Sequence, residues 1–179
     1  MVEVQIDCIR MSLMTQSRVV ILRQKDDDRY LAIWIGPFEA DAITFELQSV
    51  RPRRPLTHDL LKSVIAEMGA EIKHVAVTEL RRPEDIFYAE IVLDLNGQEF
   101  HIDSRSSDAI ALAVRAEVPI YVADDVMDAA SVRPEEDVEA ISGSEPEIVE
   151  EEAEEMDEER LDIFKNFVDT LDIDKLDDE

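Results

Sequence analysis

The sequence predicts a mixed α+β domain, built on a mostly antiparallel sheet with packed helices and followed by an acidic C-terminal tail. Segments in which apolar and polar residues alternate occur in neighbouring pairs, as in antiparallel hairpins. Segments with apolar residues three and four positions apart, typical of amphipathic helices, lie between these pairs. Beyond residue 132 the chain is rich in Asp and Glu and poor in large apolar residues.

The first part of the chain predicts three strands and a helix. Apolar residues alternate from Val2 but change parity near Cys8, which indicates a bulged strand. Residues 17–24 and 29–35 flank a polar turn and predict a hairpin. Pro37 then favours a helix start, because proline is suited to the first helical turn.

The second part predicts a stiff connector over residues 51–58 and a helix that is capped by Thr57 and ends at Gly69. Residues 71–80 and 87–95 predict strands, and Asn96-Gly97 is typical of a tight hairpin turn. The remaining expected elements are a strand at 98–103, a helix that includes 109–114, a strand at 119–122 and a short helix at 124–130.

The tripeptide Asp-Ala-Ile occurs at residues 41–43 and again at 108–110, each time after a predicted hairpin and at a helix start. We interpret this as a hairpin–helix unit that occurs twice. Under this hypothesis the two helix starts lie in related environments.

Charge divides the chain into three predicted regions: a domain at 1–132, an acidic disordered linker at 133–156 and a short amphipathic helix at 157–179. The tail helix would contact either its own domain or another protein. With a net charge of -26, the chain has no general attraction to nucleic acid, so a polyanion would need a local basic patch or a bridging metal.

No secretory signal pattern and no long apolar run occur in the sequence, so we expect a cytoplasmic protein without membrane contact. Cys8 is the only cysteine, which excludes an internal disulfide. Zinc-binding Cys/His patterns, GxGxxG, Walker and GxSxG motifs are all missing, which argues against those enzyme classes.

The stretch HIDSRSSDAIALAVR, residues 101–115, joins polar residues to a helix that is apolar on every side. Such a helix should pack against more than one surface, for example a sheet and a subunit interface. Ser104 or Ser106 could cap its amides, and Asp108 would complement its dipole. Asp103 and Arg105 could pair with each other or face a ligand.

A second cluster contains Arg51, Arg53 and Arg54, the main basic concentration of the domain. On a stiff loop these guanidinium groups suit phosphate, although pairing with the many carboxylates is an equal alternative. His58 could be a general base, a metal ligand or a hydrogen-bonding residue of a first helical turn. Glu39, at a helix start, could simply complement the helix dipole.

The motifs AIWIGPFEADAI, RPLTHDLLKSVIAEMGAEIKHVAVTEL, FYAEI and IDSRSSDAIALAVRAEVPIYV together resemble the bifunctional nuclease domain family over roughly residues 2–132. The resemblance implies a mixed α/β domain, a tendency to form homodimers or higher homo-oligomers, and cleavage of RNA and DNA. Ser106 stands where the family commonly has proline. The matching polar positions are Glu39, Arg54, His58, Asp59, Asp103, Arg105, Ser107 and Asp108.

We therefore predict a nuclease that hydrolyses phosphodiester bonds with the help of Mg²⁺ or Mn²⁺. The predicted metal ligands are Asp103, Asp108 and Glu39; the catalytic residues are His58, Asp59, Asp108 and Glu39; the phosphate-binding residues are Arg54, Arg105 and Ser107. The site requires the two helix starts and the turn before His58 to converge. The alternative is a non-catalytic oligomeric module with a partner-binding or autoinhibitory acidic tail.

Overall fold

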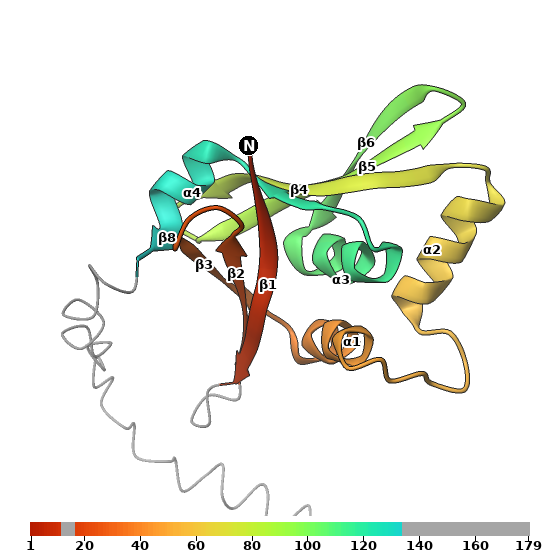
Figure 1. Ribbon diagram of the computed structural model, residues 1–179, viewed down its shortest axis with the longest axis horizontal. Helices are drawn as coiled ribbons and strands as arrows, with labels where there is room; N and C mark the ends of the chain where they lie inside the picture. Colours follow the sequence, from red (N-terminus) through yellow and green to blue (C-terminus); the bar gives the residue numbers. More distant parts are fainter. Residues whose placement is uncertain (12–16, 134–179) are drawn as a thin grey trace, which may run out of the picture. The chain divides into compact units, whose positions relative to one another are not determined.

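The computed structural model describes residues 1–11 and 17–133, shown in colour in Figure 1. The predicted helix at 157–179 and all but the first residue of the predicted linker lie outside this part. Within the described ranges, no helix has the length and apolar character needed to cross a membrane.

An eight-stranded sheet runs through the described residues in the order β6-β5-β4-β7-β1-β2-β3-β8. Neighbouring strands are antiparallel except for β4 and β7, which are parallel. The predicted mostly antiparallel α+β fold is therefore confirmed. The strands are β1 Val2–Met11, β2 Arg18–Gln24, β3 Tyr30–Ile35, β4 Glu71–Arg81, β5 Ile86–Leu95, β6 Gln98–Arg105, β7 Ile120–Val122 and β8 Ser131–Val132.

Within residues 1–11 and 17–133, four helices accompany the sheet: α1 Pro37–Leu47, α2 Thr57–Glu67, α3 Ser106–Ala116 and α4 Asp124–Ala130. Helix α3 contacts α1 and α2 as well as β4, β5 and β6 (Figure 1). Its residues Ile110, Leu112 and Ala113 have no exposed surface. The prediction that this helix packs against more than one surface is confirmed, and the surfaces within the chain are the sheet and two helices.

Several local predictions are also confirmed. The pairing of β1 with β2 shifts register between Ile6 and Cys8, where the change of apolar parity predicted a bulge. Asn96 and Gly97 both have positive φ angles, 56° and 81°, as the tight turn between β5 and β6 requires. Pro37 is the first residue of α1.

Two predicted caps are wrong. Leu56, not Thr57, precedes the first turn of α2, and its amide donates to the side chain of Asp59, 2.8 Å away. At α3 no side chain caps the helix; Ser104 Oγ donates instead to the carbonyl oxygen of Arg105. At α2 the Asp59 carboxylate takes the capping role expected for Thr57. At α3 neither Ser104 nor Ser106 caps the helix.

Candidate active site

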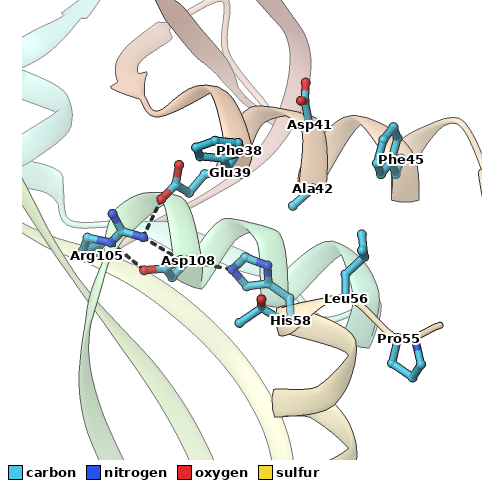
Figure 2. A pocket seen from close by; sticks show the side chains of 11 residues that line it. Phe38, Glu39, Asp41, Ala42, Phe45, Pro55, Leu56, His58, Arg105 and Asp108 are labelled. Atoms are coloured by element: carbon cyan, nitrogen blue, oxygen red, sulfur yellow. Dashed lines mark hydrogen bonds and ion pairs between the residues drawn. The ribbon is translucent and has the colours of Figure 1, made fainter. Parts of the chain in front are cut away.

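A cavity of about 550 Å³ lies where α1, the connector before α2 and the start of α3 come together (Figure 2). It contains charged, imidazole and aromatic side chains in one space. The lining residues are Phe38, Glu39, Asp41, Ala42, Phe45, Pro55, Leu56, Thr57, His58, Arg105 and Asp108. Asp41 and Asp108, the first residues of the repeated tripeptide, both line it, so the two helix starts do share an environment.

Arg105 connects two of the helix starts. Its Nε donates to Asp108 Oδ2 at 2.7 Å, and its Nη2 donates to Asp108 Oδ1 at 3.1 Å and to Glu39 Oε1 at 2.6 Å. Its Nη1 takes part in none of these bonds. Of the two alternatives for Asp103 and Arg105, mutual pairing is not observed, because Arg105, the last residue of β6, bonds to Glu39 on α1 and to Asp108 in the first turn of α3. The Nη1 edge of the guanidinium group is therefore available to an anion.

His58 completes the cluster from α2. Its Nε2 lies 3.0 Å from Asp108 Oδ1, and its side chain is almost fully buried (Figure 2). A carboxylate at this position favours the tautomer in which Nε2 carries the proton and Nδ1 carries the lone pair. Nδ1 makes no hydrogen bond with another described residue and so can act on a molecule in the cavity.

The charge state of Asp108 fits this arrangement. Burial alone would raise the pKa of the Asp108 carboxyl, but hydrogen bonds from Arg105 and His58 outweigh burial and hold the pKa below its usual range. The pKa of Arg105 is raised, first by Asp108 and then by Glu39. Near neutral pH the cavity therefore contains an ionised Asp108 and a charged Arg105.

Gly36 gives Glu39 room to reach Arg105. A Cβ atom at residue 36 would collide with the carboxylate of Glu39, which folds back over the start of α1. The φ and ψ angles of Gly36, -67° and 157°, suit any residue, so close approach and not backbone freedom explains glycine here. Sequence reasoning missed Gly36, because its importance depends on a side-chain conformation.

Arg115 is a buried arginine that holds three helices together. Its side chain donates to Asp59 Oδ1 at 2.8 Å, to the Ala111 carbonyl at 2.8 Å and to the Ala42 carbonyl at 2.9 Å. Asp59 thus faces Arg115 and the amide of Leu56, and no bond joins it to His58 or Asp108. These contacts support a structural role for Asp59 in fixing the turn that carries His58.

A second cavity, of about 500 Å³, contains the arginines of the connector. Arg51, Arg53 and Arg54 line it, and it shares Phe45, Pro55 and Leu56 with the first cavity. Arg51 Nη1 donates to Glu46 Oε2 at 2.7 Å. Within the described residues, the exposed side chains of Arg53 and Arg54 bond to no other group.

The two remaining predicted site residues line neither cavity. Asp103 lines a neighbouring groove that also includes Arg105 and Asp108, and Ser107 is buried in the first turn of α3. Glu39 and Asp108 are bonded to Arg105, so a cation between them would compete with a guanidinium group. Among the described residues no group of three or more His, Cys, Asp or Glu side chains is placed to hold a metal ion, so the predicted ligand set is not assembled.

The sheet, the helices around α3 and the histidine–carboxylate–arginine cavity define an α+β domain whose cavity contains groups that can bind an anion and transfer a proton. Residues 20–135 match the bifunctional nuclease domain, and the chain belongs to this family. The family predicted from the sequence motifs is confirmed.

Two kinds of relatives match. An uncharacterized protein of Mycobacterium tuberculosis (strain H37Rv) is 40% identical over 171 residues, which cover 94% of each chain. Bifunctional nuclease 2 of Oryza sativa subsp. japonica is 31% identical over 107 residues, 58% of this chain and 32% of that protein. Bifunctional nuclease 2 of Arabidopsis thaliana is 29% identical over 109 residues, 59% of this chain and 32% of that protein. Family membership indicates a nuclease-related role.

Proposed function

We propose that this protein is a nuclease that hydrolyses phosphodiester bonds of RNA or DNA in the cavity between α1, α2 and α3. The contact of His58 with Asp108, a carboxylate that Arg105 also binds, carries the proposal. The plant relatives named bifunctional nucleases support it. Asp59 and Ser107, which lie outside the cavity, are left out of the catalytic set.

The geometry supports a role for each group. His58 Nδ1 takes a proton from the attacking oxygen, while Asp108 accepts a hydrogen bond from the Nε2–H group and stabilises the imidazolium ion that forms. The oxygen then forms a bond to phosphorus, and the bond from phosphorus to the leaving oxygen breaks. Arg105 Nη1 faces the charge that develops on the phosphate oxygens. The leaving oxygen takes a proton from the imidazolium ion or from water.

The attacking oxygen has two possible sources. In DNA it must come from water, whereas RNA also offers its own 2′-hydroxyl, which would leave a cyclic phosphate end. Divalent-metal assistance is a separate part of the proposal. A bound Mg²⁺ or Mn²⁺ would supply Lewis-acid stabilisation; of the three predicted ligands, Glu39 and Asp108 line the cavity, where both are bonded to Arg105, and Asp103 lines the neighbouring groove.

The test uses the full chain with end-labelled RNA and DNA oligonucleotides, each with EDTA, Mg²⁺ or Mn²⁺. His58→Ala and Asp108→Asn should lower kcat by about 10²-fold or more. His101→Ala is the matched control: this exposed histidine contacts Glu90 and Glu99 on the sheet, away from the cavity, and its loss should leave the rate unchanged. Cleavage that survives in both His58→Ala and Asp108→Asn excludes this site.

One observation favours a second candidate function, an oligomeric module. Exposed apolar side chains occur on both α2 and β6: Leu61 (37% exposed) and Ile102 (46%) line one groove, and Leu60 (58%) is also exposed on α2. The β5–β6 hairpin stands at the end of the sheet (Figure 1). We propose that these exposed side chains form homodimers or higher homo-oligomers; light scattering of Leu60→Asp and Leu61→Asp against the native chain tests it, and an unchanged mass in both would reject it.

A further inference from the structure

We infer that the groove along α1 and the arginine connector is a track for single-stranded nucleic acid, in which Phe38 and Phe45 stack on unpaired bases and Arg53 and Arg54 hold the phosphates. The inference rests on the proposed function and deepens it, since it names the form of the substrate.

The first argument is the exposure of two aromatic rings. Phe38 is 83% exposed and Phe45 is 37% exposed, and exposed apolar groups that gather in a groove with polar neighbours are typical of a binding surface. Both line the cavity that contains His58 and Arg105. Figure 2 shows Phe38 at the end of α1 near Arg105 and Phe45 near Leu56. The rings therefore follow the length of the groove.

The second argument is their spacing. Seven residues along an α-helix bring the side chain back to nearly the same face and advance it by about 10 Å. That distance corresponds to about three stacked bases at roughly 3.4 Å each. Two rings placed in this way can contact different bases of one strand.

The third argument is charge. The connector that follows Phe45 presents Arg53 and Arg54, whose side chains are exposed and bond to no other described residue. The second cavity, which they line, shares Phe45, Pro55 and Leu56 with the first. Basic groups thus continue the aromatic surface in a chain whose net charge of -26 would otherwise repel a polyanion.

These features favour unpaired over paired strands. A duplex presents base edges and phosphates, and its base faces are covered by neighbouring pairs, so an aromatic ring on a helix can stack only on a base that is free. Phosphate contacts alone would not distinguish the two forms.

The experiment measures fluorescence anisotropy of a labelled single-stranded DNA oligonucleotide and of its blunt duplex, with full-length protein carrying His58→Ala. We expect tighter binding of the single strand. Phe38→Ala and Phe45→Ala should each weaken it by about 5- to 100-fold with little effect on the duplex. Trp34→Ala is the matched control, because this ring is 66% exposed on β3 and lines neither cavity.

Arg53→Gln and Arg54→Gln should each reduce the slope of log K against log salt by about 0.7, the value of one phosphate contact to a single strand. Arg10→Gln, at an exposed position on β1, is the control. Equal affinity for both forms, or full affinity in both phenylalanine variants, overturns the inference. It is also overturned if those variants change the oligomeric mass instead of binding, because the rings would then form a contact between copies of the chain.

The outcomes separate the inference from the proposed function. Selective binding of the single strand with no cleavage by the native chain would keep the track and reject the nuclease. Cleavage that depends on His58, with no preference for single strands, would keep the nuclease and reject the track.

Discussion

His58 Nε2 and Asp108 Oδ1 lie 3.0 Å apart although 50 positions separate the two residues in the chain. Helix α2 supplies the imidazole and helix α3 the carboxylate, and Arg105 connects that carboxylate to Glu39 on α1. Three helices therefore meet at one polar cluster. Small shifts between these helices should change the activity more than the stability, because proton transfer depends steeply on geometry.

Replacing Gly36 by alanine should reduce the proposed nuclease activity while the fold remains. The new Cβ atom takes the place of the Glu39 carboxylate, which must then leave Arg105, whereas the φ and ψ angles at residue 36 suit alanine. We expect activity close to that of Glu39→Gln, with similar melting temperatures. In a double-mutant cycle, Gly36→Ala should have little further effect in the Glu39→Gln background. Additive losses would show that Gly36 acts elsewhere.

Replacing Arg115 by methionine should destabilise the fold by about 2–4 kcal/mol. The substitution leaves the Asp59 carboxylate and the Ala42 and Ala111 carbonyl oxygens without their donor in a region where Arg115 itself is only 4% exposed. Urea unfolding measures the loss, and Arg10→Met at the surface should change the free energy of unfolding by less than about 0.5 kcal/mol. Similar values for both variants would contradict the structural role of Arg115.

Asp59 should make stability depend on pH in the acid range. Burial raises the pKa of its carboxyl, but hydrogen bonds from the Leu56 amide and from Arg115 outweigh burial and lower it. A lowered folded-state pKa stabilises the protein above the unfolded value, near pH 4, and this contribution is lost as pH falls through the folded pKa. Asp59→Asn should therefore be less stable than the native chain at pH 7, and the difference should shrink below about pH 4. A constant difference from pH 7 to pH 3 would contradict this.

Truncating Leu112 to alanine should cost about 2–5 kcal/mol, because its side chain has no exposed surface and α3 is enclosed by the sheet, α1 and α2. Leu60→Ala on the exposed face of α2 is the matched control and should cost less than about 1 kcal/mol in a monomer. Thermal unfolding of both variants gives the comparison. An equally large loss at Leu60 would indicate that a second copy covers that face.

The sequence was sufficient to predict most of the architecture. Periodicity identified the strands and helices, and the all-round apolar character of α3 correctly indicated burial on several sides. The convergence that the predicted site requires is present for Glu39, His58 and Asp108, which line one cavity, but not for Asp103, which lines a neighbouring groove. These features follow from local patterns, which a single sequence displays directly.

The partners of individual charges could not be predicted. Arg105 has several carboxylates within reach in the sequence, and only the packing of α1 against α3 selects Glu39 and Asp108 over Asp103. Arg115, in the last turn of an apolar helix, looks like a surface charge that complements the helix dipole, yet it is buried. Such pairings depend on contacts between distant segments, so local spacing carries no signal for them.

Strand β7, only three residues long, has β4 on one side and β1 on the other, and so joins the β1–β3 and β4–β6 portions of the sheet. Its residues come late in the described chain, after both of these three-stranded portions and three of the helices. Before β7 can pair with β4 and β1, long segments of the chain must be closed into loops. The conformational entropy lost in this step is compensated only once the strands pair. The domain should consequently fold slowly and as one cooperative unit. Neither the β1–β3 portion nor the β4–β6 portion should stay folded when Ile120–Val122 is displaced.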